Sequence, residues 1–182
     1  MMKRTWSVIL LLSKKIRVVS NASPLIYLAK AGRLHLLREL YTELLIPRKV
    51  FQETSGSKES PDALLIASAV DDGWLGVEDS AHKEVNQLAE SAGIESGEAA
   101  AILLAREEDG LLLIDDKLGR SAAKILRVTC LGTVGVLLQA VSKSILQHDE
   151  FITILDRMLD LGFRLDSKVY RRAISIAKNL SD

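Results

Sequence analysis

The hydrophobic positions along this chain fall into short unbroken runs separated by longer stretches with helical spacing. Five apolar runs predict strands, at residues 16–20, 44–46, 74–77, 111–114 and 128–131. Most are apolar at consecutive positions rather than at alternate ones, which is typical of strands covered on both faces of a parallel sheet. Helical patterns lie between the runs. We therefore expect an α/β fold, a three-layer α/β/α Rossmann-like domain with a parallel sheet of about five strands.

Capping signals indicate where several of the helices begin. Ser23 and Ser60 each precede a proline, an order that places a capping hydroxyl before the first helical residue. Thr133 is a comparable candidate after the fifth strand. The clearest helix is predicted at residues 95–109, which are alanine-rich and acidic near the start.

The two ends of the chain have different patterns from its centre. Residues 1–15 combine a basic start with an apolar run too short to span a bilayer, and we interpret them as an extension ahead of the domain. Residues 16–146 carry the alternating strand and helix pattern. Residues 147–182 carry two amphipathic helical patterns, at 151–161 and 167–180. They predict a C-terminal helical tail that packs on the domain or on a partner.

The composition excludes a global attraction to polyanions. The 182 residues include 24 basic and 24 acidic side chains, which gives a formal net charge of zero. A nucleic-acid partner must therefore be held by a local patch or through bound cations. The single Cys130 excludes an internal disulfide and suits the cytoplasm. The three histidines are scattered and show no zinc-binding spacing.

Polar side chains follow the strands that we expect at the centre of the sheet. Asp115 and Asp116 come directly after the fourth strand, and Asn21 follows the first strand. In an open parallel sheet, ligands bind beyond the carboxyl ends of the strands, where the strand order reverses. The first and fourth strands are the expected neighbours at that point. Glu98 opens the helix before the fourth strand, and from the pattern we expect it at this edge only if that helix has an unusual orientation or the preceding loop folds over.

Carboxylates that share a crevice repel one another unless a cation compensates their charge. Mg²⁺ and Mn²⁺ favour hard oxygen ligands, and such a site supports phosphodiester hydrolysis through an activated water. Simpler roles are also open for each residue. Asp115 and Asp116 can cap the next helix, and Asn21 can form an Asx turn. Glu53 can lie on a solvated helix surface, and Glu98 can serve the helix dipole.

Three segments, taken in order, resemble the PIN-domain family and are closest to its VapC-like group of toxin ribonucleases. They lie at residues 18–54, 93–105 and 111–140, and the resemblance extends over residues 17–143. It implies a Rossmann-like fold and a ribonuclease that depends on Mg²⁺ or Mn²⁺. Carried onto this chain, the metal ligands of the family fall at Asp116, Asp115, Glu98 and Glu53.

One position departs from the family pattern. Asn21 stands where the family usually has an aspartate after the first strand, and an amide brings no charge to a metal. Weaker metal binding or lost catalysis follows as a hypothesis. Asp116 matches the aspartate that the family has two places after a threonine, although Ile114 replaces that threonine here.

Basic side chains follow the acidic pair. Arg120 and Lys124 are four residues apart on one helical face and, with Lys117, suit an RNA backbone, although an ordinary solvated surface explains them equally well. Ser23 is a candidate to orient a water or a phosphate at a helix start.

Our main hypothesis is a metal-dependent endoribonuclease that acts as the toxin of a toxin–antitoxin pair. The family implies 5′-phosphate and 3′-hydroxyl products, a cognate antitoxin protein and a homodimer, with the leucine-rich stretch 25–40 or the tail as the interface. The alternative is a catalytically weakened module that binds RNA or an antitoxin without cutting. A third hypothesis, a phosphoacceptor domain of the receiver type, usually needs its acidic pair after the first strand, where this chain has Ser20 and Asn21.

Overall fold

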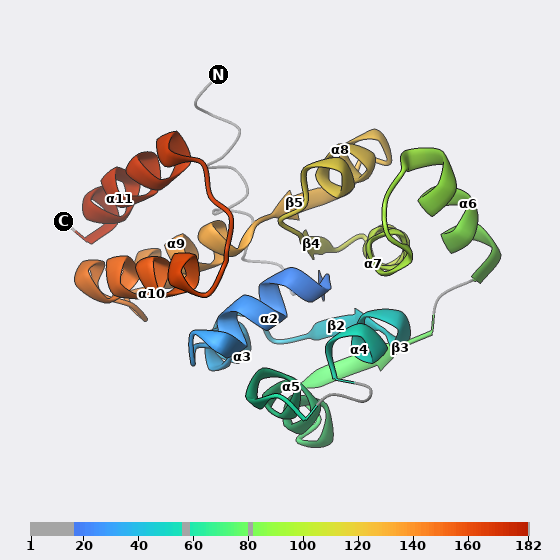
Figure 1. Ribbon diagram of the computed structural model, residues 1–182, viewed down its shortest axis with the longest axis horizontal. Coiled ribbons are helices and arrows are strands. Elements are labelled where there is room, and N and C mark those ends of the chain that lie inside the picture. The colour runs from blue at the N-terminus through green and yellow to red at the C-terminus, as the bar shows by residue number, and fades with distance from the viewer. Residues whose placement is uncertain (1–16, 56–58, 80–81, 182) are drawn as a thin grey trace.

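The computed structural model describes residues 17–55, 59–79 and 82–181, so the extension predicted at residues 1–15 lies outside the described residues. A five-stranded parallel sheet forms its centre (Figure 1). The strands are β1 (Val18–Ser20), β2 (Leu44–Pro47), β3 (Leu75–Glu78), β4 (Leu111–Leu113) and β5 (Thr129–Leu131), in the order β3-β2-β1-β4-β5. Each lies within two residues of its predicted position.

The strand order reverses between β1 and β4. Ser20 pairs with Leu113, and the backbone N–H of Asn21 donates to the carbonyl oxygen of Leu113 at 2.9 Å. The carboxyl ends of these two strands are therefore neighbours, as predicted. This is the point at which an open α/β sheet binds its ligands.

Helices cover both faces of the sheet, which confirms the three-layer α/β/α architecture. Successive strand residues point to opposite faces, so Val18 and Leu113 join one core cluster while Val19 and Leu112 join another. The helices on the first face are α2 (Ala22–Lys30), α3 (His35–Leu40) and α9 (Thr133–Ser142), and those on the second face are α7 (Ser96–Glu107) and α8 (Lys117–Ile125), with α6 (His82–Ala92) packed outside α7. Around β2 and β3 lie α4 (Arg48–Thr54) and α5 (Pro61–Asp71).

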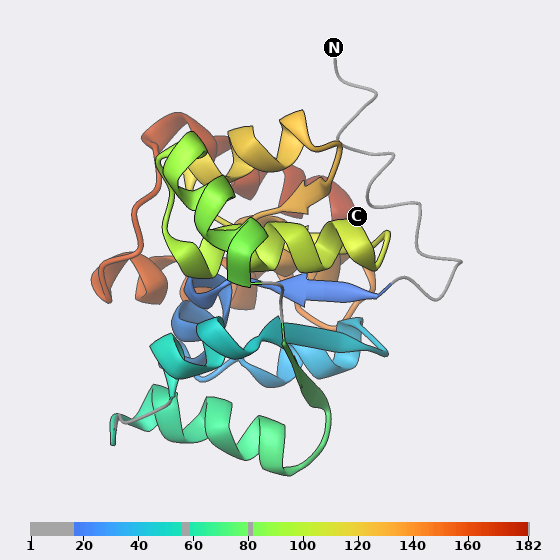
Figure 2. The same cartoon turned by 90° about the vertical axis from the view of Figure 1, so that its right-hand side faces the viewer.

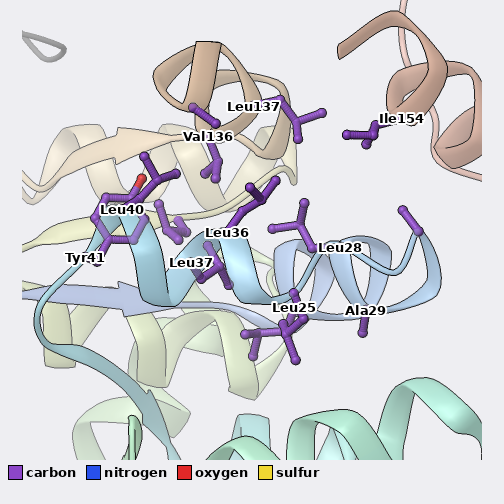
Figure 3. Close-up of a cluster of buried hydrophobic side chains, with 14 of the residues drawn as sticks. Leu25, Leu28, Ala29, Leu36, Leu37, Leu40, Tyr41, Val136, Leu137 and Ile154 are labelled. Carbon is purple, nitrogen blue, oxygen red and sulfur yellow. The ribbon is translucent and has the colours of Figure 1, made fainter. Parts of the chain in front are cut away.

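The leucines of α2 and α3 form the centre of the larger core. Figure 3 shows Leu28 and Leu36 facing Leu137 of α9, with Ile154 of the tail close by. Leu25, Leu28 and Leu37 expose no surface at all. These leucines therefore pack inside one chain, and the prediction that the stretch 25–40 forms an interface between two chains stays a prediction.

The C-terminal tail forms two helices, α10 (His148–Asp160) and α11 (Ser167–Ser181). They pack on each other and on α9, and Phe151, Met158 and Ala173 are buried in the larger core. The connection between them, residues 161–166, lies on the side of the molecule toward which β1 points (Figure 2). Within the described ranges, no helix is both long and apolar enough to cross a membrane.

Two of the three predicted capping hydroxyls make different bonds. α2 begins at Ala22 rather than after Ser23, and α9 begins at Thr133, with Gly132 at the cap position. Both hydroxyls donate to the carboxylate of Asp115 instead. A charged acceptor forms a stronger hydrogen bond than a neutral one, so the carboxylate competes successfully for these hydroxyl donors. Ser60 does precede α5, but its side chain makes no capping bond.

Candidate active site

Glu98 and Asp116 meet at the carboxyl edge of the sheet, on either side of Gly119. The backbone N–H of Gly119 donates to Oδ1 of Asp116 at 2.8 Å, and a Cβ atom at Gly119 would lie 3.6 Å from Oε1 of Glu98. Glu98 reaches this edge without any unusual helix orientation. Because α7 leads into the amino end of β4, its own first turn, which carries Glu98, lies at the carboxyl edge of the sheet.

The environment of Glu98 disfavours its charged form. Burial raises the pKa of Glu98, and the negative charge of Asp116 raises that pKa further. Glu95 and Glu53 act in the same direction, although more weakly, while a hydrogen bond from the backbone N–H of Glu95, at 3.2 Å, opposes the shift. Repulsion of this kind is relieved by a cation, so this part of the site suits a metal ion.

Glu53 approaches the same place from α4. Its carboxylate lies against Gly97 in the first turn of α7, so closely that a side chain at position 97 would collide with it. The partial positive charge at a helix amino end favours a carboxylate there. Glu53 is therefore part of the acidic cluster with Glu98 and Asp116 rather than a solvated surface residue.

Asn21 supplies a buried oxygen that has no donor. The residue is only 5% exposed, and its Oδ1 accepts no hydrogen bond from any residue that the structure describes. A buried acceptor without a partner destabilises a fold by about 1–3 kcal/mol. A hard cation or a molecule bound to one would satisfy this oxygen, which fits the position of Asn21 at the end of β1.

Asp115 differs from its neighbour in its hydrogen bonds. It accepts from the hydroxyl of Ser23 at 2.9 Å, from the backbone N–H of Thr133 at 2.8 Å and from the hydroxyl of Thr133 at 2.6 Å. These bonds tie the end of β4 to α2 and α9. The carboxylate of Asp115 is therefore engaged by three donors of the protein, whereas Asp116 accepts one, from the backbone N–H of Gly119.

The four predicted carboxylates do not all converge on one point. Across the described ranges, no three His, Cys, Asp or Glu side chains form a ready-made metal site. Mg²⁺ needs fewer protein ligands, because it is commonly bound by one or two carboxylates with water and substrate phosphates. Glu98 and Asp116, with the orphaned oxygen of Asn21 nearby, fit that requirement, and the ligand role of Asp115 stays a prediction.

A groove runs from this edge along α8. Its first part is a hollow of about 460 Å³ that includes Ser23, Asp116 and Lys117, and its second part is a hollow of about 620 Å³ that includes Arg120 and Lys124. Asp115 and Lys117 line both parts, so the two hollows are adjacent. The residues predicted to contact RNA thus line this groove. It begins at the carboxyl edge of the sheet beside Asp116, and we call the place where Asp116, Glu98 and Glu53 meet the acidic edge.

Sequence reasoning missed the residues that form the opposite wall of this groove. Gly162, Phe163 and Arg164, from the connection between α10 and α11, line it together with Tyr27 of α2. Tyr27 and Gly162 are 135 positions apart in the sequence, and no spacing pattern links them. The break between the two tail helices was the only available signal.

Comparisons with known proteins agree with this geometry. A family model described as a PIN domain matches residues 17–179, so this chain belongs to the PIN-domain family, whose members are generally nucleases that use divalent metals. The match includes the tail, beyond the stretch 17–143 that shows the resemblance in sequence. The solved structures include a similar one, the crystal structure of PAE2754 from Pyrobaculum aerophilum, with a TM-score of 0.53 and 16% identity. The similarity covers 70% of this chain and 98% of that chain and supports the fold alone. No curated protein matches the sequence.

Proposed function

We propose that this protein is an endoribonuclease that depends on Mg²⁺ or Mn²⁺ and that Asp116 and Glu98 are its principal metal ligands. The observation that carries the proposal is that these two carboxylates lie on either side of Gly119 at the strand switch point. Membership of the PIN-domain family supports it, because members are generally nucleases. The fold alone would not, because one fold can serve many functions.

The residues of the site have distinct roles in this mechanism. When bound, the cation supplies a water of lowered pKa and stabilises charge on the attacked phosphate. Asp116 is oriented for binding because the N–H of Gly119 holds its Oδ1. Asn21 offers a neutral oxygen, and Glu53 adds negative charge behind Glu98. Asp115 fixes Ser23 and α9 around the centre.

The substrate follows from the charge of the groove. Lys117, Arg120 and Lys124 line it and suit the phosphates of an RNA strand whose scissile bond lies at the acidic edge. We expect 5′-phosphate and 3′-hydroxyl products, as the family resemblance implies.

The biological role is proposed from the VapC-like pattern of motifs. In this role the protein is a toxin that cuts RNA in the cytoplasm and is silenced by an antitoxin protein, and it forms a homodimer. The stretch 25–40 and the tail remain the two interface candidates, and each would contribute its exposed residues, because most apolar side chains of both are buried in the core or packed against it.

A second function is supported by Asn21. A protein without the usual aspartate can bind RNA or an antitoxin in the groove and cleave slowly or not at all. Changing Asn21 to Asp separates the two possibilities. If the change raises both Mn²⁺ affinity and the cleavage rate, Asn21 is a weakened ligand, and if it changes neither, Asn21 is not part of the site.

The main test compares two isosteric changes that each remove one negative charge. Asp116→Asn should abolish metal-dependent cleavage of a fluorescent single-stranded RNA. Asp160→Asn, at an exposed position at the end of α10, should leave cleavage unchanged. Both variants should retain the circular dichroism spectrum of the wild type. Undiminished cleavage by the Asp116 variant would place the activity at another site.

A further inference from the structure

The connection between α10 and α11 is anchored to α2 by Tyr27. The Tyr27 hydroxyl donates to the carbonyl oxygen of Gly162 at 3.1 Å, and its ring meets that of Phe163 edge-on, with centroids 5.0 Å apart. Gly162 adopts a φ of 94°, which a residue with a side chain rarely takes, and Phe163 is 7% exposed. The connection is therefore held in place against the helix that begins beside the acidic edge.

This anchored connection forms one wall of the groove. Phe163 and Arg164 line both of its parts, as Asp115 and Lys117 do. The facing wall is α8, with Arg120 and Lys124. A ligand that lies in the groove therefore has basic side chains on both sides, and one end of it lies beside the carboxylates of the acidic edge.

The basic residues of the groove form no ion pair with any residue that the structure describes. Throughout the described ranges, the ion pairs of arginine with Asp or Glu involve Arg17, Arg33, Arg48 and Arg106, all outside the groove. Lys117, Arg120, Lys124 and Arg164 have no carboxylate oxygen within 4.0 Å in that part of the chain. Unpaired cations along a groove attract a polyanion.

The remaining lining is apolar. Leu131, Val134, Leu165 and Val169 contribute to the part of the groove beside α8. A strand of RNA has both of the required surfaces, because its phosphates match the cations and its bases and riboses can cover apolar side chains. An acidic peptide offers the same charge. RNA is favoured because a strand whose scissile bond lies at Asp116 would extend from there into this groove.

We propose that RNA lies between α8 and the α10–α11 connection and that Arg164 contacts its backbone, so the C-terminal tail completes the substrate site. This inference rests on the proposed function and extends it. Tyr27 acts as a positioning residue, since it holds the segment that carries Arg164.

The first test measures binding without cleavage. Fluorescent single-stranded RNA is titrated with full-length protein in EDTA at several KCl concentrations, and the affinity is read by anisotropy. One lost phosphate contact should reduce the slope of log affinity against log salt by about 0.7. We expect this reduction, with severalfold weaker binding at low salt, for Arg164→Gln. The matched control, Arg157→Gln at an exposed position on α10, should behave as the wild type. Equal slopes for the two variants would overturn the inference.

The second test addresses Tyr27. Tyr27→Phe keeps the ring and removes only the hydroxyl that bonds Gly162. It should weaken RNA binding in the wild-type background and have no further effect in the Arg164→Gln background, with an unchanged melting temperature. An effect of equal size in both backgrounds would show that Tyr27 does not act through Arg164, which overturns its positioning role.

The outcomes also separate this inference from the proposed function. If Asp116→Asn stops cleavage but Arg164→Gln binds RNA normally, only the inference fails. If the wild type binds RNA with the expected dependence on Arg164 but never cleaves it, only the proposed function fails. Tighter binding of polyglutamate than of RNA at equal charge concentration would assign the groove to an acidic protein and overturn the inference. A wild type that binds no RNA would overturn it as well.

Discussion

Alanine at Asp115 and alanine at Asp116 remove the same charge from adjacent positions, yet the structure predicts very different losses of stability. Asp115 accepts three hydrogen bonds, one from Ser23 and two from Thr133. Asp116 accepts one, from the backbone of Gly119. Thr133 is completely buried while Asp115 is in place, so its two donors are satisfied by this carboxylate rather than by water.

The magnitude follows from these bonds. A hydrogen bond to a charged group contributes about 1.5–3 kcal/mol, and neighbouring bonds to one carboxylate are not additive, so Asp115→Ala should lower the free energy of unfolding by about 3–5 kcal/mol. Asp116→Ala removes one helix-capping bond, which is about 1 kcal/mol, and also relieves the repulsion with Glu98. For a domain of this size, each kcal/mol of lost stability lowers the melting temperature by about 2–4 °C. The melting temperature should therefore fall by about 6–20 °C for Asp115→Ala and by at most about 4 °C for Asp116→Ala.

The assay is thermal unfolding followed by circular dichroism, in EDTA at neutral pH, so that no metal contributes to either variant. The melting temperature should be highest for the wild type, lower for Asp116→Ala and lowest for Asp115→Ala. The difference between the two variants should be the largest. If both variants unfold at the same temperature, Asp115 does not tie β4 to α2 and α9, and its hydrogen bonds have no energetic importance.

Three further predictions concern the acidic cluster. Because the pKa of Glu98 is raised in the folded state, ionised Glu98 destabilises the fold at neutral pH, and this effect vanishes below the unfolded value of about 4.3. Glu98→Gln, which keeps the capping acceptor, should therefore raise the melting temperature in EDTA at neutral pH and not in acid. Mg²⁺ at one hundred times its Kd should stabilise the wild type by about 2.7 kcal/mol in a thermal-shift measurement, and Glu98→Gln much less. Gly97→Ala should displace the flexible Glu53 side chain and reduce cleavage as much as Glu53→Gln, with little change in melting temperature because alanine favours the helix. A large loss of stability would contradict that explanation.

The sheet was predictable because its strands are buried on both faces. Such strands show as unbroken apolar runs, and the order of strand and helix requires parallel pairing with right-handed crossovers. The same reasoning places the start of α7, and hence Glu98, at the carboxyl edge, although the hydrophobic pattern alone did not reveal it. The hydrogen-bond partner of the Ser23 and Thr133 hydroxyls was not predictable. It is Asp115, which comes from a distant part of the chain.

The amino-acid sequence by itself determined the layers, the neighbouring ends of β1 and β4, and the chemical type of the site, because these depend on local periodicity and on which residues end each strand. Only the tertiary structure decided that Asp115 ties helices together while Asp116 faces Glu98, and that Arg164 reaches the groove. Those distinctions depend on side-chain direction and on contacts between segments far apart in the sequence. No local pattern records such contacts, since they arise only when the helices pack on the sheet.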